Sequence, residues 1–215
     1  MEGSKSSEIS CPYCEAPMEF DRGVYKCAEC GYEAVKPTHE VNLKLACERA
    51  GIPRRYLDVD AEGAPELERE GKGLYIQGGN GTLKTTLAMA IAKKCVADGW
   101  KVRVTSGLSI LAKLRGADRA DADLLAEELA APDLLVLDDL GKENPTEWVV
   151  STLFQIVNER YNSMRTTVVT SNYTKQQLAE RYTVDGDSST AESIVSRLFD
   201  MTSKLECDGG DRRLA

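Results

Sequence analysis

The chain lacks any long hydrophobic run. No apolar stretch in its 215 residues approaches the ~20 residues that a membrane-spanning helix needs. The first ten residues, MEGSKSSEIS, are polar and lack the hydrophobic region of a signal peptide. We therefore expect a cytoplasmic protein with no membrane partner.

An excess of positive charge is also missing. The sequence has 27 Lys and Arg residues against 35 Asp and Glu residues, which gives a formal net charge of -8. A surface that binds nucleic acid indiscriminately needs clustered basic residues to displace counterions. Any contact with DNA should therefore be local, and scattered basic residues are more often plain solvated surface. The candidate basic groups are Lys101 with Arg103, Lys113 with Arg115 and Arg119, and Lys175 with Arg181.

Internal repeats and low-complexity tracts are absent as well. The residues are 42% hydrophobic, which is enough to build a packed core. A chain of this length has room for one α/β domain and a small appendage.

The cysteines are concentrated near the start of the chain. Four of the seven form two C-x-x-C pairs, Cys11 with Cys14 and Cys27 with Cys30. Each pair can supply two thiolates from a tight turn, and together they form a tetrahedral zinc site. Disulfides are the alternative, but a cytoplasmic chain disfavours them. With four thiolates available, the single histidine, His39, is not needed as a ligand.

The segment between the two cysteine pairs, residues 18–26, is predicted to form a short hairpin that turns at Asp21-Arg22-Gly23. The result would be a zinc ribbon of about 25 residues, unfolded without its metal.

A glycine-rich stretch, Gly-Gly-Asn-Gly-Thr-Leu-Lys-Thr at 78–85, follows an apolar run and opens a predicted helix. Such a loop turns its backbone N–H groups onto an anion, and the helix adds the positive end of its dipole. The spacing is that of the P-loop, in which Lys84 would reach the β and γ phosphates of ATP and Thr85 would hold Mg²⁺. The alternative is an ordinary Gly/Asn turn. The predicted nucleotide-binding residues are Gly78, Gly79, Asn80, Gly81, Thr82, Leu83, Lys84, Thr85 and Thr86.

Leu83 stands where the P-loop pattern has its last glycine. A right-handed backbone there would still direct the N–H group at a phosphate. A positive φ would cost about 1 kcal/mol or more for leucine. The substitution therefore leaves open whether the protein hydrolyses ATP or only binds it.

A second motif, Leu-Leu-Val-Leu-Asp-Asp at 134–139, is an apolar strand that ends in two acids, as in a Walker B motif. Asp138 would bind Mg²⁺, directly or through its water, and Asp139 would orient the attacking water. The alternative is a pair of solvated acids that cap a buried strand. That alternative requires a coincidence with the P-loop about fifty residues upstream.

The remaining pattern alternates strands with helices, which predicts a parallel sheet covered by helices on both faces. The predicted strands are 73–77, 101–105, 133–138 and 166–171, and the predicted helices are 41–50, 85–98, 107–115, 121–130, 146–163, 174–182 and 190–203. The predicted divisions are a flexible N-terminus at 1–10, the zinc ribbon at 11–34, a linker and first helix at 35–72, and an ATPase core at 73–215.

Two further polar residues follow at positions that an ATPase would use. Asn172, after the strand 166–171, could orient the water or contact the γ phosphate, or could cap the next helix. Arg197 could reach the nucleotide of a neighbouring subunit as an arginine finger, or could lie along its own helix.

The ordered motifs resemble the AAA+ ATPases of the bacterial and phage DnaC/DnaI helicase-loader group. The similarity covers roughly residues 42–213. It rests on the P-loop, Leu-Asp-Asp-Leu-Gly at 137–141, Arg-Ala-Gly-Ile-Pro-Arg-Arg-Tyr at 49–56, Glu-Trp at 147–148, Asn-Glu-Arg-Tyr at 158–161, Thr-Ser-Asn at 170–172, Ser-Arg-Leu at 196–198 and Asp-Gly-Gly-Asp-Arg-Arg at 208–213.

This resemblance implies an α/β P-loop fold of the AAA+ class, with Asn172 as sensor 1 and Arg197 as a finger acting between self-associated subunits. It implies a loader whose core binds single-stranded DNA and whose zinc ribbon grips a replicative DNA helicase hexamer. Arg212 or Arg213 would stand in for the sensor 2 arginine. The transposition helper ATPase IstB is closely similar and remains an alternative, as does an ATP-binding adaptor without hydrolysis.

Overall fold

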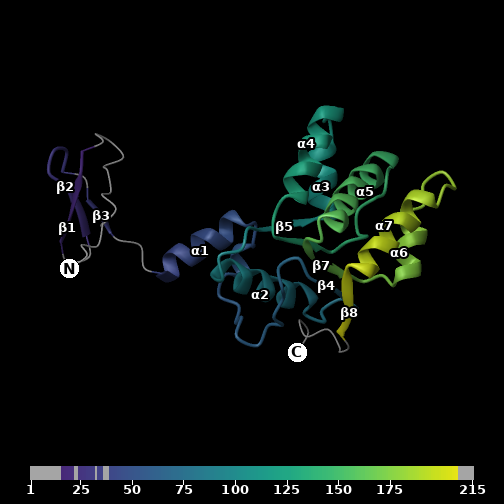
Figure 1. Ribbon diagram of the computed structural model, residues 1–215, viewed down its shortest axis with the longest axis horizontal. Coiled ribbons are helices and arrows are strands. Elements are labelled where there is room, and N and C mark those ends of the chain that lie inside the picture. The colour runs from purple at the N-terminus through teal and green to yellow at the C-terminus, as the bar shows by residue number, and fades with distance from the viewer. Residues whose placement is uncertain (1–15, 22–23, 32, 36–38, 208–215) are drawn as a thin grey trace. The chain divides into compact units, whose positions relative to one another are not determined.

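A computed structural model describes residues 16–21, 24–31, 33–35 and 39–207. The chain divides into two units, residues 1–43 and residues 44–215. Each unit is described by itself (Figure 1). Among the described residues, no helix is both long enough and apolar enough to cross a membrane.

The first unit contains a three-stranded antiparallel sheet of β1 (Met18–Asp21), β2 (Val24–Cys27) and β3 (Glu33–Val35). The hairpin predicted from the sequence is present as β1 and β2, whereas β3 was not predicted. Cys27 is buried at the end of β2, and its carbonyl accepts a hydrogen bond of 3.0 Å from the Gly31 N–H. Gly31 has a φ of 74°, so the chain makes a tight turn around the second cysteine pair.

The zinc site itself remains a prediction. Cys11 and Cys14 lie outside the described residues, as do Arg212 and Arg213. Within the part of the chain that the structure describes, no three metal-ligating side chains come together. The second cysteine pair alone supplies only half of the predicted ligands.

The second unit is built around a five-stranded sheet in the order β5-β6-β7-β4-β8, with every neighbouring pair parallel. The two central strands, β6 and β7, are almost fully buried because helices cover both faces. The strands are β4 (Gly73–Gly78), β5 (Val102–Ser106), β6 (Leu134–Asp138), β7 (Thr166–Ser171) and β8 (Thr202–Cys207).

Helices lie on both sides of this sheet, with α2 on one face and α5 on the other (Figure 1). Helix α5 packs against α3, α4 and α7, and α7 packs against α6. The main hydrophobic cluster lies between these helices and the sheet, and includes Leu135, Leu153 and Leu198. The helices are α2 (Lys84–Ala97), α3 (Gly107–Leu114), α4 (Arg119–Ala130), α5 (Glu147–Asn162), α6 (Lys175–Tyr182) and α7 (Ser189–Asp200).

Helix α1 (His39–Arg49) is followed two residues later by Gly51, whose φ is 91°. A Cβ atom at Gly51 would lie 2.6 Å from the carbonyl oxygen of Val104 in β5, so only glycine fits there. The Val104 N–H donates a 2.7 Å hydrogen bond to the Ala50 carbonyl, which fastens the end of the helix to the sheet. A short 3-10 helix, η1 (Arg54–Tyr56), follows directly.

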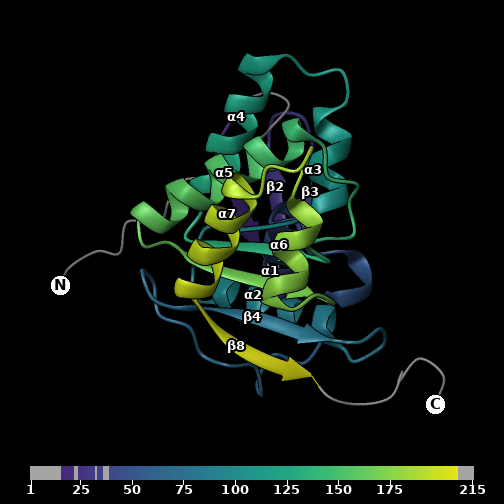
Figure 2. The same ribbon diagram turned by 90° about the vertical axis from the view of Figure 1, so that its right-hand side faces the viewer.

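One predicted element was wrong. The helix predicted at 190–203 stops at Asp200, and the chain continues as the edge strand β8 beside β4 (Figure 2). The sequence of β8, Thr-Ser-Lys-Leu-Glu-Cys, is polar and half exposed, because an edge strand has a neighbour on one side only. It therefore lacks the apolar run that marks the inner strands. The other predicted strands and helices begin and end within two residues of the observed ones.

Candidate functional site

The predicted phosphate loop, residues 78–85, runs from the end of β4 to the start of α2. Gly78 ends β4 opposite Cys207 of β8, and a Cβ atom at Gly78 would lie 2.4 Å from the Cys207 carbonyl oxygen. Gly81 has a φ of 75°, in the left-handed region. Glycine is therefore required at one position by close packing and favoured at the other by backbone conformation.

Leu83 also adopts the left-handed conformation, with φ 63° and ψ 18°. The cost of about 1 kcal/mol or more that the sequence analysis attached to a positive φ therefore applies. The backbone follows the course that a glycine would allow, and the side chain is 42% exposed. Among the described residues, no side chain caps the start of α2, so its first N–H groups face the loop without a side-chain acceptor.

Lys84 is the first residue of α2 and is only 6% exposed. Its Nζ atom donates a 2.5 Å hydrogen bond to the Gly79 carbonyl and lies 3.5 Å from the Thr82 hydroxyl. Burial lowers the pKa of Lys84, and the nearby charge of Asp139 opposes that shift. A buried ammonium group held by neutral oxygens is well suited to accept an anionic partner.

Asp138 lies at the end of β6, where three elements meet. Its Oδ1 atom accepts hydrogen bonds from Thr85 at 2.9 Å and from Thr170 of β7 at 2.7 Å. Burial raises the pKa of this carboxyl group, whereas the two hydroxyl groups act in the opposite direction. A buried carboxylate beside a threonine hydroxyl offers the hard oxygen ligands that Mg²⁺ prefers.

Asp139 follows with a φ of 55°, so the chain turns sharply as it leaves β6. Its N–H donates a 2.8 Å hydrogen bond to the Thr170 hydroxyl. Its carboxylate makes a 2.9 Å ion pair with Lys142 at a partly exposed position. Thr170 thus contacts both acids, although the sequence analysis did not single it out. A threonine inside a fully buried strand is the signal that could have identified it.

The phosphate loop and the two acids line a cavity of about 410 Å³. That volume lies within the range of ordinary small-molecule sites. Three residues around η1 and one after the acids also line it, none of which was predicted as a site residue. The lining residues are Pro53, Arg55, Tyr56, Asn80, Gly81, Thr82, Leu83, Lys84, Thr85, Thr86, Asp138, Asp139 and Lys142.

Asn172 lies close to the phosphate loop, because its Nδ2 atom donates a 2.9 Å hydrogen bond to the Asn80 side chain. Its own Oδ1 atom is buried and has no hydrogen-bond partner among the described residues. The residue that caps α6 is Thr174, which forms a capping box with Gln177. The position of Asn172 is therefore not explained by helix capping.

Arg197 lies on α7 and does not line the cavity of the phosphate loop. Its guanidinium lies over the rings of Phe154 and Tyr161, and Nη1 donates a 3.1 Å hydrogen bond to the Ser193 carbonyl. It lines a second, open cavity that also includes Lys175. Within one chain, the structure does not bring Arg197 to the predicted phosphate site.

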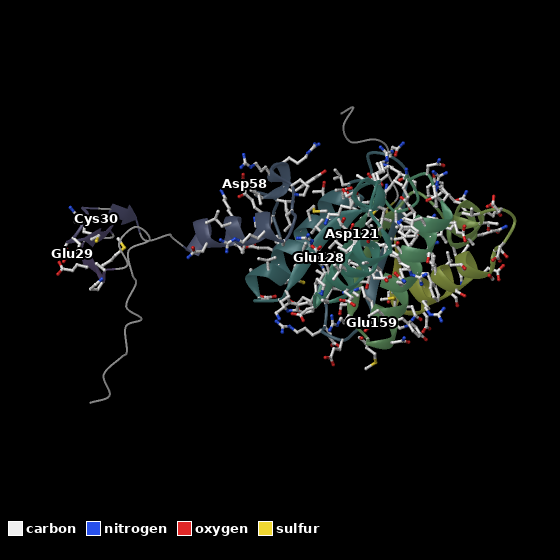
Figure 3. All side chains as sticks on the ribbon, turned by 90° about the horizontal axis from the view of Figure 1, so that it is seen from above. Glu29, Cys30, Asp58, Asp121, Glu128 and Glu159 are labelled. Carbon is white, nitrogen blue, oxygen red and sulfur yellow. The ribbon has the colours of Figure 1, made fainter. Side chains whose placement is uncertain are left out.

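Several of the basic residues proposed for DNA contact are engaged within the chain. Arg103 and Lys113 both form ion pairs with Glu128 of α4, which is labelled in Figure 3. Arg181 donates hydrogen bonds to the carbonyl groups of Gly141 and Glu143. The ion pairs with Glu128 offset part of the charge of Arg103 and Lys113, and the hydrogen bonds of Arg181 occupy donors that a phosphate would need.

Comparison with known proteins identifies two kinds of relatives. The replicative helicase loader DnaI of Bacillus subtilis is 24% identical over 151 residues, which is 67% of this chain and 48% of that protein. A putative insertion sequence ATP-binding protein of Sinorhizobium fredii is 30% identical over 130 residues, which is 60% of this chain and 42% of the relative. The matched part of the chain thus spans about half the length of these relatives or less.

The fold is also shared with solved structures. A crystal structure of DnaI matches with a TM-score of 0.62 and 24% identity, covering 75% of this chain and 94% of that one. The predicted fold class, an α/β P-loop core of the AAA+ type with a parallel sheet flanked by helices, is confirmed. The model of the family described as IstB-like ATP binding protein matches residues 66–215, and the chain belongs to this family of ATP-binding proteins.

Proposed function

We propose that this protein is an ATPase that acts as a helicase loader in DNA replication. It would deliver a replicative DNA helicase hexamer onto single-stranded DNA, with ATP binding and hydrolysis as the switch. The observation that carries the proposal is the meeting of Lys84, Thr85 and Asp138 around one cavity. A relative that is named as a helicase loader supports the biological role.

The residues present fit Mg-ATP. The uncapped N-terminus of α2 and the loop N–H groups would bind the phosphates, and Lys84 would exchange its Gly79 carbonyl contact for phosphate oxygens. Thr85 and Asp138 would hold Mg²⁺, which supplies charge neutralisation at the β and γ phosphates when bound. Asp139 would orient the attacking water, and Asn172 would contact the γ phosphate or that water.

The proposal extends to the partners. Arg197 does not line the cavity of the phosphate loop in its own chain. Its position suits an arginine finger that would serve the nucleotide of a neighbouring subunit in a self-associated assembly. The first unit, with its predicted zinc ribbon, would bind the helicase, and the core would contact single-stranded DNA. The protein would act in the cytoplasm.

A second candidate is a transposition helper ATPase of the IstB kind. The similarity to an insertion sequence ATP-binding protein favours it. Such a helper would bind duplex DNA and a transposase in place of the helicase. The two candidates therefore differ in the partner that forms a stable complex.

The loader proposal is tested by light scattering on a size-exclusion column. The zinc-loaded protein is mixed with its host's replicative helicase, with and without Mg-ATP. We expect a co-eluting complex of fixed stoichiometry. No complex in either condition, together with binding to duplex DNA, would favour the transposition helper.

The left-handed backbone at Leu83 leads to a prediction about turnover. Because the loop already follows the path of a glycine, Leu83→Gly should hydrolyse ATP at a rate within about twofold of the wild type. Steady-state phosphate release measures this. Turnover in the glycine variant alone would instead support an adaptor that binds ATP without hydrolysing it.

Leu83→Ala is the matched control, since it shortens the side chain and keeps the backbone strain. Leu83→Gly should exceed Leu83→Ala by about 1 kcal/mol in free energy of unfolding, measured by denaturant titration. Equal stabilities would mean that the left-handed turn stores no strain.

The raised pKa of Asp138 gives a prediction about stability and pH. A carboxyl group with a raised pKa in the folded state contributes stability at low pH that is lost as the pH rises through that pKa. Asp138→Asn should therefore raise the melting temperature of the nucleotide-free protein at neutral pH and weaken its Mg²⁺-dependent affinity for ATP. Calorimetry measures both quantities.

Asp187 provides a control of opposite sign. Hydrogen bonds from Ser189 lower the pKa of Asp187, so its contribution is present at neutral pH and lost as the pH falls. Asp187→Asn should therefore not stabilise the protein. An unchanged or lower melting temperature in Asp138→Asn would contradict our account of the buried carboxylate.

A further inference from the structure

A buried carboxyl group, Glu143, lies five residues after the Walker B aspartate and is fully enclosed. Its two oxygens accept hydrogen bonds from the Gly141 N–H at 3.3 and 3.1 Å. The Tyr182 hydroxyl, at the end of α6, donates to the same carboxyl group. Burial and the nearby Glu143 raise the pKa of Tyr182 well above 10, so the phenol keeps the proton that it donates.

The surroundings of Glu143 are shaped to hold it. A Cβ atom at Gly107, the first residue of α3, would lie 2.0 Å from a Glu143 carboxyl oxygen, so the carboxyl group occupies the space that any other residue there would fill. The positive end of the α3 dipole faces the same group. Arg181 holds the backbone of the same segment, because it donates hydrogen bonds to the carbonyl groups of Gly141 and Glu143.

The loop from Asp139 to Glu143 is therefore fastened on two sides. On the β7 side, the Thr170 hydroxyl accepts from the Asp139 N–H, and the Leu140 N–H donates to the Thr170 carbonyl at 2.9 Å. On the α6 side, the Glu143 carboxyl group and Arg181 bind the backbone around Gly141, and Tyr182 donates to the Glu143 carboxyl group. Such complete pairing of a short loop stabilises conformations that the chain otherwise avoids, here Asp139 at φ 55° and Gly141 at φ 94°.

The side chain of Asp139 has no comparable support of its own. Among the described residues, the Asp139 carboxylate pairs with Lys142 at a partly exposed position, where such ion pairs contribute little. The direction of its carboxylate is therefore set by the backbone on either side. That backbone is fixed toward the N-terminus by Thr170 and toward the C-terminus by Gly141.

We propose that Glu143 is a positioning residue that holds the Walker B loop, through the Gly141 N–H and with Tyr182 as its partner, so that Asp139 faces the phosphate site. The inference rests on the proposed function, because it assumes that Asp139 serves ATP hydrolysis. It adds a residue that touches neither nucleotide nor metal. Helix α6, which carries Tyr182, follows Asn172 closely in the sequence.

Removal of the carboxyl group should affect turnover more than binding. Glu143→Ala is expected to lower kcat by about tenfold or more, because small displacements of an orienting group are costly. The Kd for ATP should stay within about threefold of the wild type, because the phosphate loop and Lys84 are held independently. Glu143→Gln keeps one oxygen for the Gly141 N–H and should restore most of the rate.

A matched control separates positioning from loss of stability. Thr167 of β7 is, like Glu143, a buried polar residue. Its hydroxyl accepts a 2.9 Å hydrogen bond from the buried Arg160, away from the phosphate site. Thr167→Val should lower the melting temperature and leave kcat unchanged at a temperature where the protein is folded. An equal fall of kcat in both variants, or an unchanged kcat in Glu143→Ala, would overturn the proposal.

Hydrogen exchange of the 139–143 segment provides a readout that needs no turnover. If the wild type binds ATP but does not hydrolyse it, the hydrolytic part of the proposed function is wrong. Hydrogen exchange then still tests whether Glu143 holds the loop. We expect exchange at Leu140 and Gly141 to be about tenfold faster in Glu143→Ala, with α2 still protected. Unchanged exchange would reject a positioning role. If Glu143→Ala does not fold, Tyr182→Phe replaces it in both measurements. It should change kcat and the exchange rate in the same direction as Glu143→Ala. An unchanged kcat and an unchanged exchange rate would count against the positioning role.

Discussion

The carboxylate of Asp138 joins the elements on which the site depends. It accepts one hydrogen bond from Thr85 at the start of α2 and one from Thr170 inside β7, while it ends β6 itself. Three segments that are far apart in the sequence thus meet at one buried charge. A charge in such a place costs stability, as the raised pKa of Asp138 indicates, and the cost is offset when a cation binds.

Other hydrogen bonds join neighbouring elements around the cavity in the same way. Thr170 bonds the side chain of Asp138 and the backbone N–H of Asp139, so one residue holds both acids. Asn172 connects β7 to the phosphate loop through Asn80. The loop 139–143 is connected to α6, because Glu143 accepts a hydrogen bond from Tyr182 and Arg181 donates to the carbonyl groups of Gly141 and Glu143. The strand ends are therefore held from several directions, which is the preorganisation that the proposed phosphoryl transfer would use.

Local motifs in the sequence predicted the parts of the site that depend on local spacing. The phosphate loop and the two acids were found because each is a short pattern at the end of an apolar strand, and parallel strands bring such ends to one edge of a sheet. The backbone of Leu83 could only be posed as two alternatives, because its φ depends on the packing of the whole loop. The contacts of Glu143 with Tyr182 join residues 39 positions apart, and no periodicity connects them. The strand β8 was missed because its polar residues reflect an exposed edge.

We expect the cavity between the phosphate loop and the two acids to bind Mg-ATP. Isothermal titration calorimetry of the full chain with ATP and Mg²⁺ measures this binding, with Lys84→Ala as the comparison. One nucleotide should bind per chain in the wild type, and binding should be lost in the variant, whose fold is verified by circular dichroism. A folded wild type that takes up no ATP, or a variant that binds equally well, would contradict it.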